Sequence, residues 1–468
     1  MQHMGNVPHV LAVPFPAQGH VIPLMEFALC LVNQGIKVTF VNTEFNHERV
    51  IKSLSEAEED VPDMLHLVSI PDGLEPWEDR NDLIKLTHVL LEVVPVKLKS
   101  LIEKLNQSEN EKLTCVVADY SMGCAVEVAV KMGLNGVAFW PAAAALLAQL
   151  FSIPKLMDDG IIDSTGAPLK NEMVKLSPNM LAMDPAHFVW NCIADANANR
   201  NAFELTIKNN RIIGMVEFLI CNSTDELEIE AFTLYPEILP IGPLLARNRL
   251  GNSVGHFWPE DSDCLTWLDK QPPQSVIYVA FGSFTVFDQT QFRELAMGLE
   301  LTNMPFLWVV RQDLTKETEH AYPEGFEDRI RGRGRLAGWA PQQKVLSHPS
   351  VACFLSHCGW NSTIEGVSNG LPFLCWPYFA DQFLNQSYIC DVWKVGLGFT
   401  QKNGIVGRCE IKSKIEQILA DEELKTRALA LKAKVVNSVK EEGRSGKNFN
   451  NFIKWIKDHS CSEKALVD

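Results

Sequence analysis

The segment Ser356–Gly366, SHCGWNSTIEG, concentrates side chains that could hold an anionic ligand. It follows the apolar run VACFLS, which predicts a buried strand, and NSTIEG then has the composition of a helix start. The unpaired N–H groups and the positive dipole end of a helix start favour a phosphate group. Gly359 would let the backbone approach that ligand closely. The side chains that would add neutral donors are His357, Asn361 and Ser362.

Polar residues capable of chemistry follow four predicted strands at the point where each strand ends. They are His20, Asp119, Ser283 and His357. In open parallel sheets, ligands bind outside the carboxyl ends of the strands. Two sheets whose carboxyl edges face one another would bring all four residues around one cleft. The sequence therefore predicts a ligand-binding cleft built from two parts of the chain.

Apolar runs alternate with longer helical patterns along most of the chain, which is typical of α/β proteins. Near the start, HVLAVPFP predicts a strand, Val21–Gly35 an amphipathic helix, and KVTFVN the next strand. A second such unit begins at Ser275–Ser283, with a predicted helix in TQFRELAMGLEL and a predicted strand in PFLWVVR. Two starts of this kind predict two doubly wound domains in series. The expected divisions are an amino-terminal domain over 1–245, a polar linker over 246–263, a carboxy-terminal domain over 264–449 and a terminal helix over 450–468.

Composition narrows the classes of ligand and partner. The chain has 468 residues, of which 46% are hydrophobic and 21% charged, and its formal charge is -16. Such a charge argues against nucleic acid or an anionic membrane surface as a main partner, and favours a small, weakly polar ligand. The apolar stretch Gly136–Pro154 is interrupted by Pro141 and Gln149, so we expect a strand and a buried helix there and no membrane span. The chain begins without a secretory pattern, and its twelve scattered cysteines indicate reduced thiols in a cytoplasmic protein and no zinc site.

Two common nucleotide motifs are missing from the sequence. FPAQGH and AFGSFT each lie between a predicted strand and a predicted helix, but neither has the G-x-G-x-x-G spacing of a nicotinamide dinucleotide site. GRSGKN lies far from any predicted strand and lacks the P-loop spacing, which argues against ATP hydrolysis. A nucleoside diphosphate could still bind at helix starts through backbone N–H groups and hydroxyls.

The segment Trp339–Gln382 resembles the signature box of the plant secondary-product glycosyltransferases, which are inverting, UDP-sugar-dependent enzymes of plant family 1. Flanking matches in FPAQGH, in the strand before Asp119, in Gly242–Leu244 and in FGS extend the resemblance over nearly the whole chain. The resemblance implies the GT-B fold, an α/β arrangement of two facing Rossmann-like domains with an interdomain cleft. It also implies that the terminal helix packs back on the amino-terminal domain. No metal and no resident cofactor are expected, with UDP-glucose as co-substrate.

The resemblance assigns the nucleotide sugar to the carboxy-terminal domain. Trp339 would stack on uracil, where base–aromatic stacking contributes roughly 1–3 kcal/mol, although a core position for this Trp is the alternative. Glu365 would accept hydrogen bonds from the ribose, unless Ser362 and Glu365 form an ordinary capping box. Trp360, Asp381 and Gln382 would face the sugar. In the family a final Gln in the box, here Gln382, is associated with glucose and a His with galactose. The full set of expected donor-binding residues is Ser283, Trp339, Ala340, Gln342, His357, Gly359, Trp360, Asn361, Ser362, Glu365, Asp381 and Gln382.

His20 and Asp119 match the catalytic pair of the same family. His20 lies at a helix start, where the dipole disfavours imidazolium, and Asp119 would orient the ring and stabilise the charge it acquires. Taken singly, each residue could instead be a structural helix-start His or a cap after a strand. As a pair they would deprotonate an acceptor hydroxyl, which then attacks UDP-glucose to give a β-glucoside. Base catalysis of this kind contributes roughly 10²–10⁴ in rate.

The acceptor is the least determined part of the prediction. The residues expected to bind it are Phe15, Gly19, Trp140, Phe151, Trp190 and Phe379, although the aromatic ones fit a core equally well. A flavonoid or other phenol is the first expectation and a triterpenoid or steroid the second. Pro141 stands where many relatives have a Thr that contacts the donor sugar, so this contact is lost or replaced by Trp140 or water. We expect a monomer; a sugar-nucleotide epimerase and a non-catalytic UDP-sugar-binding protein are the alternatives.

Overall fold

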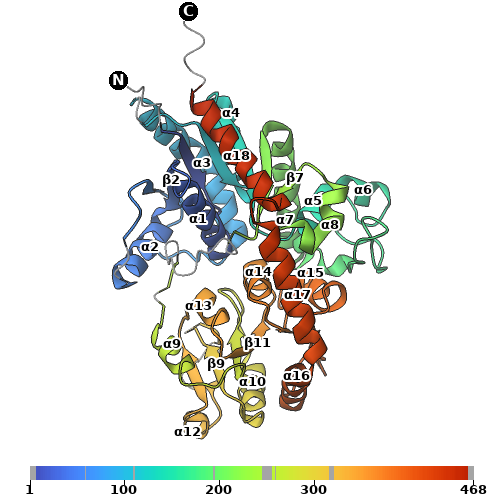
Figure 1. The fold of residues 1–468 in the computed structure, drawn as a ribbon. Helices are drawn as coiled ribbons and strands as arrows, with labels where there is room; N and C mark the ends of the chain where they lie inside the picture. The colour runs from blue at the N-terminus through green and yellow to red at the C-terminus, as the bar shows by residue number, and fades with distance from the viewer. Residues whose placement is uncertain are drawn as a thin grey trace, which may run out of the picture. The chain divides into compact units, whose positions relative to one another are not determined.

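The chain folds into two compact α/β units (Figure 1). The computed structural model describes residues 7–57, 60–108, 111–192, 195–244, 256–258, 260–311, 313–315 and 321–461. The first unit comprises the described residues within 1–247, 253–258 and 437–468, and the second those within 259–436. Most of the predicted linker over 246–263 lies outside the described residues.

The first unit is built on a parallel sheet of seven strands in the order β3-β2-β1-β4-β5-β6-β7. The strands are β1 (His9–Val13), β2 (Lys37–Thr43), β3 (Leu65–Ile70), β4 (Cys115–Asp119), β5 (Asn135–Trp140), β6 (Phe218–Cys221) and β7 (Ile238–Pro240). Their near-continuous apolar sequences suit strands that are covered on both faces. Val13 of β1 pairs with Ala118 of β4, so the segments after these two strands leave the same edge side by side.

Helices cover both faces of this sheet. Val10 and Ala12 of β1 lie in one core cluster with residues of α1, α2 and α18, whereas Leu11 alternates to the other face, and α3 and α4 contact β3, β4 and β5. The helices of this unit are α1 (Gln18–Val32), α2 (Glu44–Ala57), α3 (Leu83–Asn106), α4 (Gly123–Lys131), α5 (Ala144–Phe151), α6 (Ile153–Asp158), α7 (Ala196–Asn210), α8 (Asp225–Leu234) and α18 (Arg444–Cys461).

Helix α18 packs on the first unit although it comes from the end of the chain (Figure 1). Its apolar residues recur at helical spacing, and Phe452 contacts Phe27 of α1 and Phe218 of β6. The helix begins at Arg444, whereas the predicted terminal helix begins at Asn450, so the predicted boundary falls inside one continuous helix.

The second unit repeats the same strand order with six parallel strands, β10-β9-β8-β11-β12-β13. They are β8 (Val276–Ala280), β9 (Phe306–Val309), β10 (Gly334–Ala337), β11 (Val351–Ser356), β12 (Phe373–Cys375) and β13 (Gly396–Gly398). The helices are α9 (Asp263–Leu268), α10 (Gln289–Leu301), α12 (Phe326–Ile330), α13 (Gln342–Leu346), α14 (Trp360–Asn369), α15 (Gln382–Ser387), α16 (Arg408–Ala420) and α17 (Glu422–Ser438). Ala280 of β8 pairs with Ser356 of β11, which again brings two post-strand segments together.

The predicted strands and helices around the candidate site are confirmed with small shifts of their ends. The stretch Gly136–Pro154 forms β5 and the buried helix α5, as its sequence predicted. Among the helices that the structure describes, none is both long and apolar enough to cross a membrane. The cysteines whose side chains are described are free thiols, and most of them are buried.

Candidate functional site

His20 and Asp119 form a hydrogen-bonded pair in the first unit. The distance between His20 Nδ1 and Asp119 Oδ2 is 2.8 Å. His20 lies in the first turn of α1 and its side chain is 30% exposed, whereas Asp119, the last residue of β4, is fully buried. The second oxygen of Asp119 accepts the backbone N–H of Ser121 at 2.8 Å. With Nδ1–H donating to the carboxylate, the lone pair of the ring lies on Nε2, which is the arrangement that a general base requires.

The pair lies at the topological switch point of the sheet. β1 and β4 are neighbours, and the order of the strands reverses between them. Open parallel sheets bind their ligands at this position. Phe15, from the same β1–α1 segment, contacts the His20 ring edge-on with ring centroids 5.2 Å apart. Phe15 is buried, whereas Gly19 is exposed.

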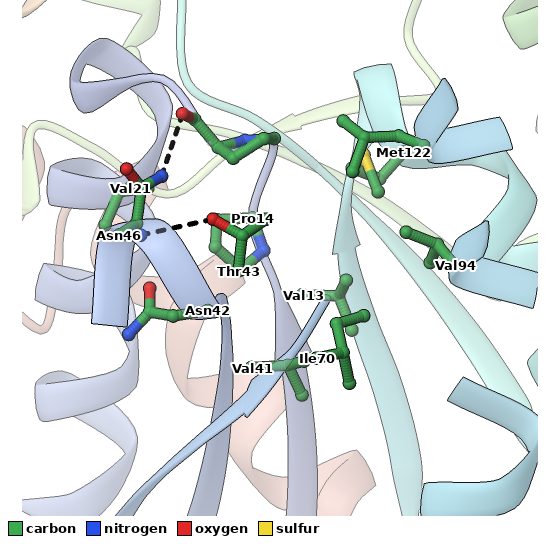
Figure 2. A pocket seen from close by; sticks show the side chains of 12 residues that line it. Val13, Pro14, Val21, Val41, Asn42, Thr43, Asn46, Ile70, Val94 and Met122 are labelled. Atoms are coloured by element: carbon green, nitrogen blue, oxygen red, sulfur yellow. Dashed lines mark hydrogen bonds between the residues drawn. The ribbon is translucent and has the colours of Figure 1, made fainter. Parts of the chain in front are cut away.

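A small cavity of about 10 Å³ lies at the same edge of the sheet (Figure 2), and its lining includes residues close in sequence to His20 and Asp119. Val21 directly follows His20, and Met122 closes the turn that begins after Asp119. The lining residues are Val13, Pro14, Pro16, Val21, Val41, Asn42, Thr43, Asn46, Ile70, Leu90, Val94 and Met122. This mostly aliphatic wall was not predicted, because its members come from three strands and four helical segments.

In the second unit, the loop after β8 and the turn after β11 also flank a switch point, because β8 and β11 are the neighbours at which the strand order reverses. Ser283 lies in the first segment and His357 in the second. A Cβ atom on Gly282 or Gly359 would lie 2.5 Å from His357 Nε2, so only glycine leaves room for the ring. Burial, and secondly the charge of Arg311, lowers the pKa of His357 to about 4. The ring is therefore neutral at physiological pH and can donate one hydrogen bond.

Gln342, Ser362 and Glu365 form a hydrogen-bonded group in the second unit. Gln342 Nε2 donates to Ser362 Oγ at 2.9 Å and to Glu365 Oε2 at 2.7 Å. Tyr278 donates its hydroxyl to Gln342 Oε1 at 3.2 Å. The capping-box alternative for Ser362 and Glu365 is wrong: α14 begins at Trp360 with Gly359 as its N-cap, so both residues lie inside the helix. Three of the predicted donor-binding residues are thus already joined to one another.

Trp339 and Ala340 lie between β10 and α13. Trp339 is half-buried and is not part of the hydrophobic core cluster of this unit. Its backbone carbonyl accepts the N–H of Asp261 at 2.8 Å, which fixes the segment. Ala340 is buried, and Pro341 is the N-cap of α13, which begins with Gln342. This placement leaves part of the indole accessible for stacking.

The residues predicted to face the sugar have separate environments. Gln382 Oε1 accepts the backbone N–H groups of Tyr378 at 2.7 Å and Phe379 at 3.1 Å, so its side chain can offer a ligand only N–H donors. Asp381 Oδ2 accepts Asn385 Nδ2 at 2.7 Å, and the same amide donates to the Cys358 carbonyl at 2.9 Å. Asn385, which was not predicted, thereby ties α15 to the turn after β11.

Trp360 is 3% exposed, and its ring lies 6.4 Å from that of Trp393. Gln382 is enclosed to a similar extent, at 4% exposed. The predicted contacts of both side chains with a sugar stay predictions. Asn361, the residue after Trp360, is half-buried in the first turn of α14.

Several predicted acceptor residues are core residues. Trp190 is 1% exposed, packs against Phe188 and Phe203, and donates its indole N–H to the Gly166 carbonyl at 3.0 Å. Trp140 donates its indole N–H to the Ala143 carbonyl at 2.8 Å, so this N–H does not replace the sugar contact that Pro141 cannot make. The assignment of the Trp190 side chain to the acceptor is therefore corrected, because distant segments enclose its ring.

The other two predicted acceptor residues lie in different units. Phe151, at the end of α5, packs against Tyr120 and Tyr235 in the first unit. Phe379 is half-buried in the second unit and contacts Phe284 with ring centroids 6.3 Å apart.

Glu228 is a buried carboxylate that sequence reasoning missed. It is 1% exposed, and it accepts the N–H groups of Ala144 and Ala145 at 2.8 Å each and the hydroxyl of Ser223 at 2.6 Å. It therefore caps α5, the helix that follows Trp140 and Pro141. Burial raises the pKa of Glu228 to about 7. Nothing in the helical pattern of α8 distinguishes Glu228 from its acidic neighbours.

Comparison with known proteins identifies the family. Residues 255–435 match the family model described as UDP-glucoronosyl and UDP-glucosyl transferase. Over 466 residues the chain is 49% identical to UDP-glycosyltransferase 83A1 of Arabidopsis thaliana, covering 97% of this chain and 98% of that one. The chain belongs to the plant UDP-glycosyltransferases. It is also 35% identical over 482 residues to linamarin synthase 1 of Manihot esculenta, with 96% and 97% of the two chains covered.

Solved structures of plant UDP-glycosyltransferases have the same fold. The structure of Phytolacca americana UGT2 complexed with UDP-2fluoro-glucose and pterostilbene matches with a TM-score of 0.79 and 27% identity, covering 96% of this chain and 99% of that one. The two parallel-sheet units therefore form a GT-B fold, as the resemblance implied. The chain is a UDP-sugar-dependent glycosyltransferase, and this family membership favours a transferase over the epimerase and the non-catalytic alternatives.

Proposed function

We propose that this UDP-glycosyltransferase transfers glucose from UDP-glucose to a hydroxyl group of a small-molecule acceptor, with inversion, to give a β-O-glucoside. The observation that carries the proposal is the 2.8 Å hydrogen bond between His20 Nδ1 and the fully buried Asp119 carboxylate. If His20 only stabilised the start of α1, a hydrogen bond to a backbone group would be enough, and a buried carboxylate at the switch point of the sheet would not be required. This arrangement is suited to a general base.

The proposed reaction balances as a single displacement. His20 Nε2 removes the proton of the acceptor hydroxyl while the oxygen forms a bond to the anomeric carbon of UDP-α-glucose. The bond from that carbon to the diphosphate oxygen breaks, and UDP leaves with the electron pair on the opposite side. The Asp119 carboxylate stabilises the imidazolium that forms. No acid is required for the leaving group, since a diphosphate is a stable anion.

The second unit offers neutral and positive partners for the departing UDP. His357 is neutral. Asn361 and Ser362 lie in the first turn of α14, whose unpaired backbone N–H groups form the positive end of the helix dipole. Donors aimed at developing negative charge stabilise a transition state without reorganisation. The proposal therefore requires no metal ion and no resident cofactor, and UDP-glucose serves as co-substrate.

Glucose is the proposed sugar. Gln382 is committed through its oxygen to two backbone N–H groups, so its amide nitrogen is the atom that can donate to a sugar hydroxyl. A fixed donor discriminates between epimers because a wrong hydroxyl leaves a partner unpaired. The structure of the related Phytolacca UGT2 contains UDP-2fluoro-glucose, which supports UDP-glucose as the donor of this enzyme.

A flavonoid or other phenol is the proposed acceptor class, with a triterpenoid or steroid second. The small cavity near His20 has a mainly aliphatic lining, and the buried ring of Phe15 packs against His20. These apolar surroundings of the base favour an acceptor body with few polar groups. The Phytolacca structure contains pterostilbene, which supports a small organic acceptor. We include a cytoplasmic enzyme in the proposal because the described cysteines are free thiols. A monomer is the proposed oligomeric state.

The test is an acceptor panel offered with UDP-glucose or UDP-galactose in the presence of EDTA and analysed by mass. The expected result is a hexose adduct from UDP-glucose whose new glycosidic bond has the β configuration by NMR. His20→Ala should lower the turnover roughly 10²–10⁴-fold and leave the Kd for UDP unchanged. His88→Ala, in helix α3, is the matched control and should behave as the wild type. Wild-type turnover by His20→Ala, or a hexose adduct only when a divalent metal is added, would contradict the proposal.

A further inference from the structure

Arg311 is a buried cation beside the proposed diphosphate site. It follows β9, is 4% exposed, and reaches the loop between β8 and α10. Its Nη1 donates to the Gly282 carbonyl and its Nη2 to the Thr285 carbonyl at 2.9 Å. Its Nε donates to Asp313 Oδ1 at 2.8 Å. One guanidinium therefore bridges both ends of the segment that contains Ser283.

The charge of Arg311 is only partly balanced by this environment. The side chain of Asp313 is 58% exposed, so water screens the carboxylate far more than the buried guanidinium. A buried cation lowers stability unless it is well paired. A neutral side chain with two N–H donors could hold the same two carbonyl groups, so fixing the loop does not by itself require a charge. The same charge reaches His357, whose pKa it lowers in addition to the effect of burial. The positive potential thus extends to the turn where the donor phosphates are proposed to bind.

The geometry of the loop depends on the same contacts. Gly282 has a φ of 67°, and its Cα leaves no room for a Cβ beside the His357 ring. Thr285 is 1% exposed, so the far end of the segment is anchored inside the unit. A planar guanidinium with fixed donors can hold both ends in one orientation, which a flexible ammonium cannot do.

We propose that Arg311 is a positioning residue of the donor site, which fixes the Gly282–Thr285 loop and supplies positive charge for the diphosphate of the UDP-sugar. This inference rests on the proposed function, because that proposal places the diphosphate at Ser283, His357 and the start of α14. It predicts a selective effect: the diphosphate depends on Arg311, whereas the uridine part does not.

The experiment compares the Kd values of UDP and uridine for the wild type, Arg311→Met and Arg311→Lys. Arg311→Met should weaken UDP about tenfold or more and leave uridine within about twofold. Arg311→Lys keeps the charge but cannot bridge the loop in one plane, so UDP should weaken about threefold. Arg329→Met is the matched control, since Arg329 also pairs with a carboxylate and donates to a carbonyl, at Glu300 and Glu324, and should leave both Kd values unchanged.

The outcomes separate this inference from the proposed function. Equal losses for UDP and uridine in Arg311→Met would show a general structural role and overturn the inference, as would unchanged UDP binding in both variants. Either result leaves the proposed function standing if the wild type binds UDP and transfers glucose. A wild type that binds no UDP would remove the proposed donor site and this inference together. If Arg311→Met does not fold, Arg311→Lys provides the test: a weaker UDP affinity with an unchanged uridine affinity supports the inference, and an unchanged UDP affinity overturns it.

A spectroscopic measurement tests the charge separately. Burial and Arg311 lower the pKa of His357 to about 4. In Arg311→Met the pKa of His357, followed by NMR of the ring and assigned with His357→Ala, should rise towards its ordinary value. An unchanged pKa in a folded Arg311→Met protein would contradict an electrostatic role for Arg311.

Discussion

Asp119 acts on His20 through one oxygen and on the backbone through the other. The bond to the Ser121 N–H fixes the rotation of the carboxylate, so the oxygen that meets Nδ1 cannot turn away. A carboxylate held in this way selects one tautomer of the imidazole and favours its protonated form during reaction. The orientation of the proposed base is thus decided by two hydrogen bonds, and not by the histidine alone.

Asp119→Asn is expected to keep the fold and lose most of the turnover. The amide can still accept the Ser121 N–H, but it carries no charge to stabilise the imidazolium. We expect kcat to fall roughly 10²–10⁴-fold while the Kd for UDP stays unchanged, measured by steady-state kinetics and calorimetry. Asp82→Asn, which alters a similar cap at the start of α3, should have wild-type kcat. A wild-type kcat for Asp119→Asn would show that the pair is structural.

At the scale of elements, α8 supports α5 through Glu228. The backbone of α8 leaves helical geometry at this residue, with φ of -141° and ψ of 44°, which directs the carboxylate to the start of α5. The acidic group meets the N–H groups of a helix start, where negative charge is favoured. Burial nevertheless outweighs these bonds, and the pKa of Glu228 rises to about 7.

The raised pKa of Glu228 predicts a pH-dependent stability. Between the ordinary value of 4.5 and about 7, the unfolded chain loses the proton of Glu228 while the folded chain keeps it. Folded protein therefore binds more protons in this window, and the free energy of unfolding falls as the pH rises through it. The shift corresponds to about 3 kcal/mol of stability, which is fully present below pH 4.5 and fully lost above pH 7.

Glu228→Gln should remove this contribution. The variant cannot ionise, so the difference in the free energy of unfolding between Glu228→Gln and the wild type should increase from pH 5 to pH 7.5, measured by urea denaturation. Glu226→Gln, an exposed change in the same helix, should run parallel to the wild type. A constant difference between Glu228→Gln and the wild type across the window would contradict the raised pKa.

At the scale of the molecule, the end of the chain completes the core of the first unit. Phe449, Phe452, Ile453 and Ile456 of α18 are buried in one cluster with α1 and the first sheet. The first unit therefore depends on residues that are separated from its other elements by the whole second unit. Folding of the first unit must wait for contacts of large sequence separation, which carry a high loop-closure cost.

Phe452→Ala tests this dependence. Removing a buried aromatic ring leaves a cavity and typically lowers the free energy of unfolding by about 3–5 kcal/mol. We expect a loss of that size in urea denaturation, because Phe452 contacts Phe27, Phe218 and Trp455. Lys454→Ala, an exposed position of the same helix, should change stability by less than about 0.5 kcal/mol. Equal stability of Phe452→Ala and the wild type would show that α18 is dispensable for this core.

The sequence by itself determined the α/β class, most of the strands and helices near the site, and the positions of His20 and Asp119 beside strand ends. These features depend on apolar periodicity and on residues that are close along the chain, as at β1 followed by α1. The donor segment Trp339–Gln382 was recognised for the same reason, since its residues form one continuous pattern.

Only the tertiary structure decided the order of the strands, and with it the two switch points at β1–β4 and β8–β11. It also decided which aromatic residues are core, as Trp190 shows, and which charges are buried, as Glu228 and Arg311 show. The physical reason is that burial and hydrogen-bond pairing are set by neighbours far away in sequence. The spacing of residues along the chain does not indicate those neighbours. The spacing of Ser362 and Glu365 therefore allowed a capping box, whereas in the fold both residues bond to Gln342.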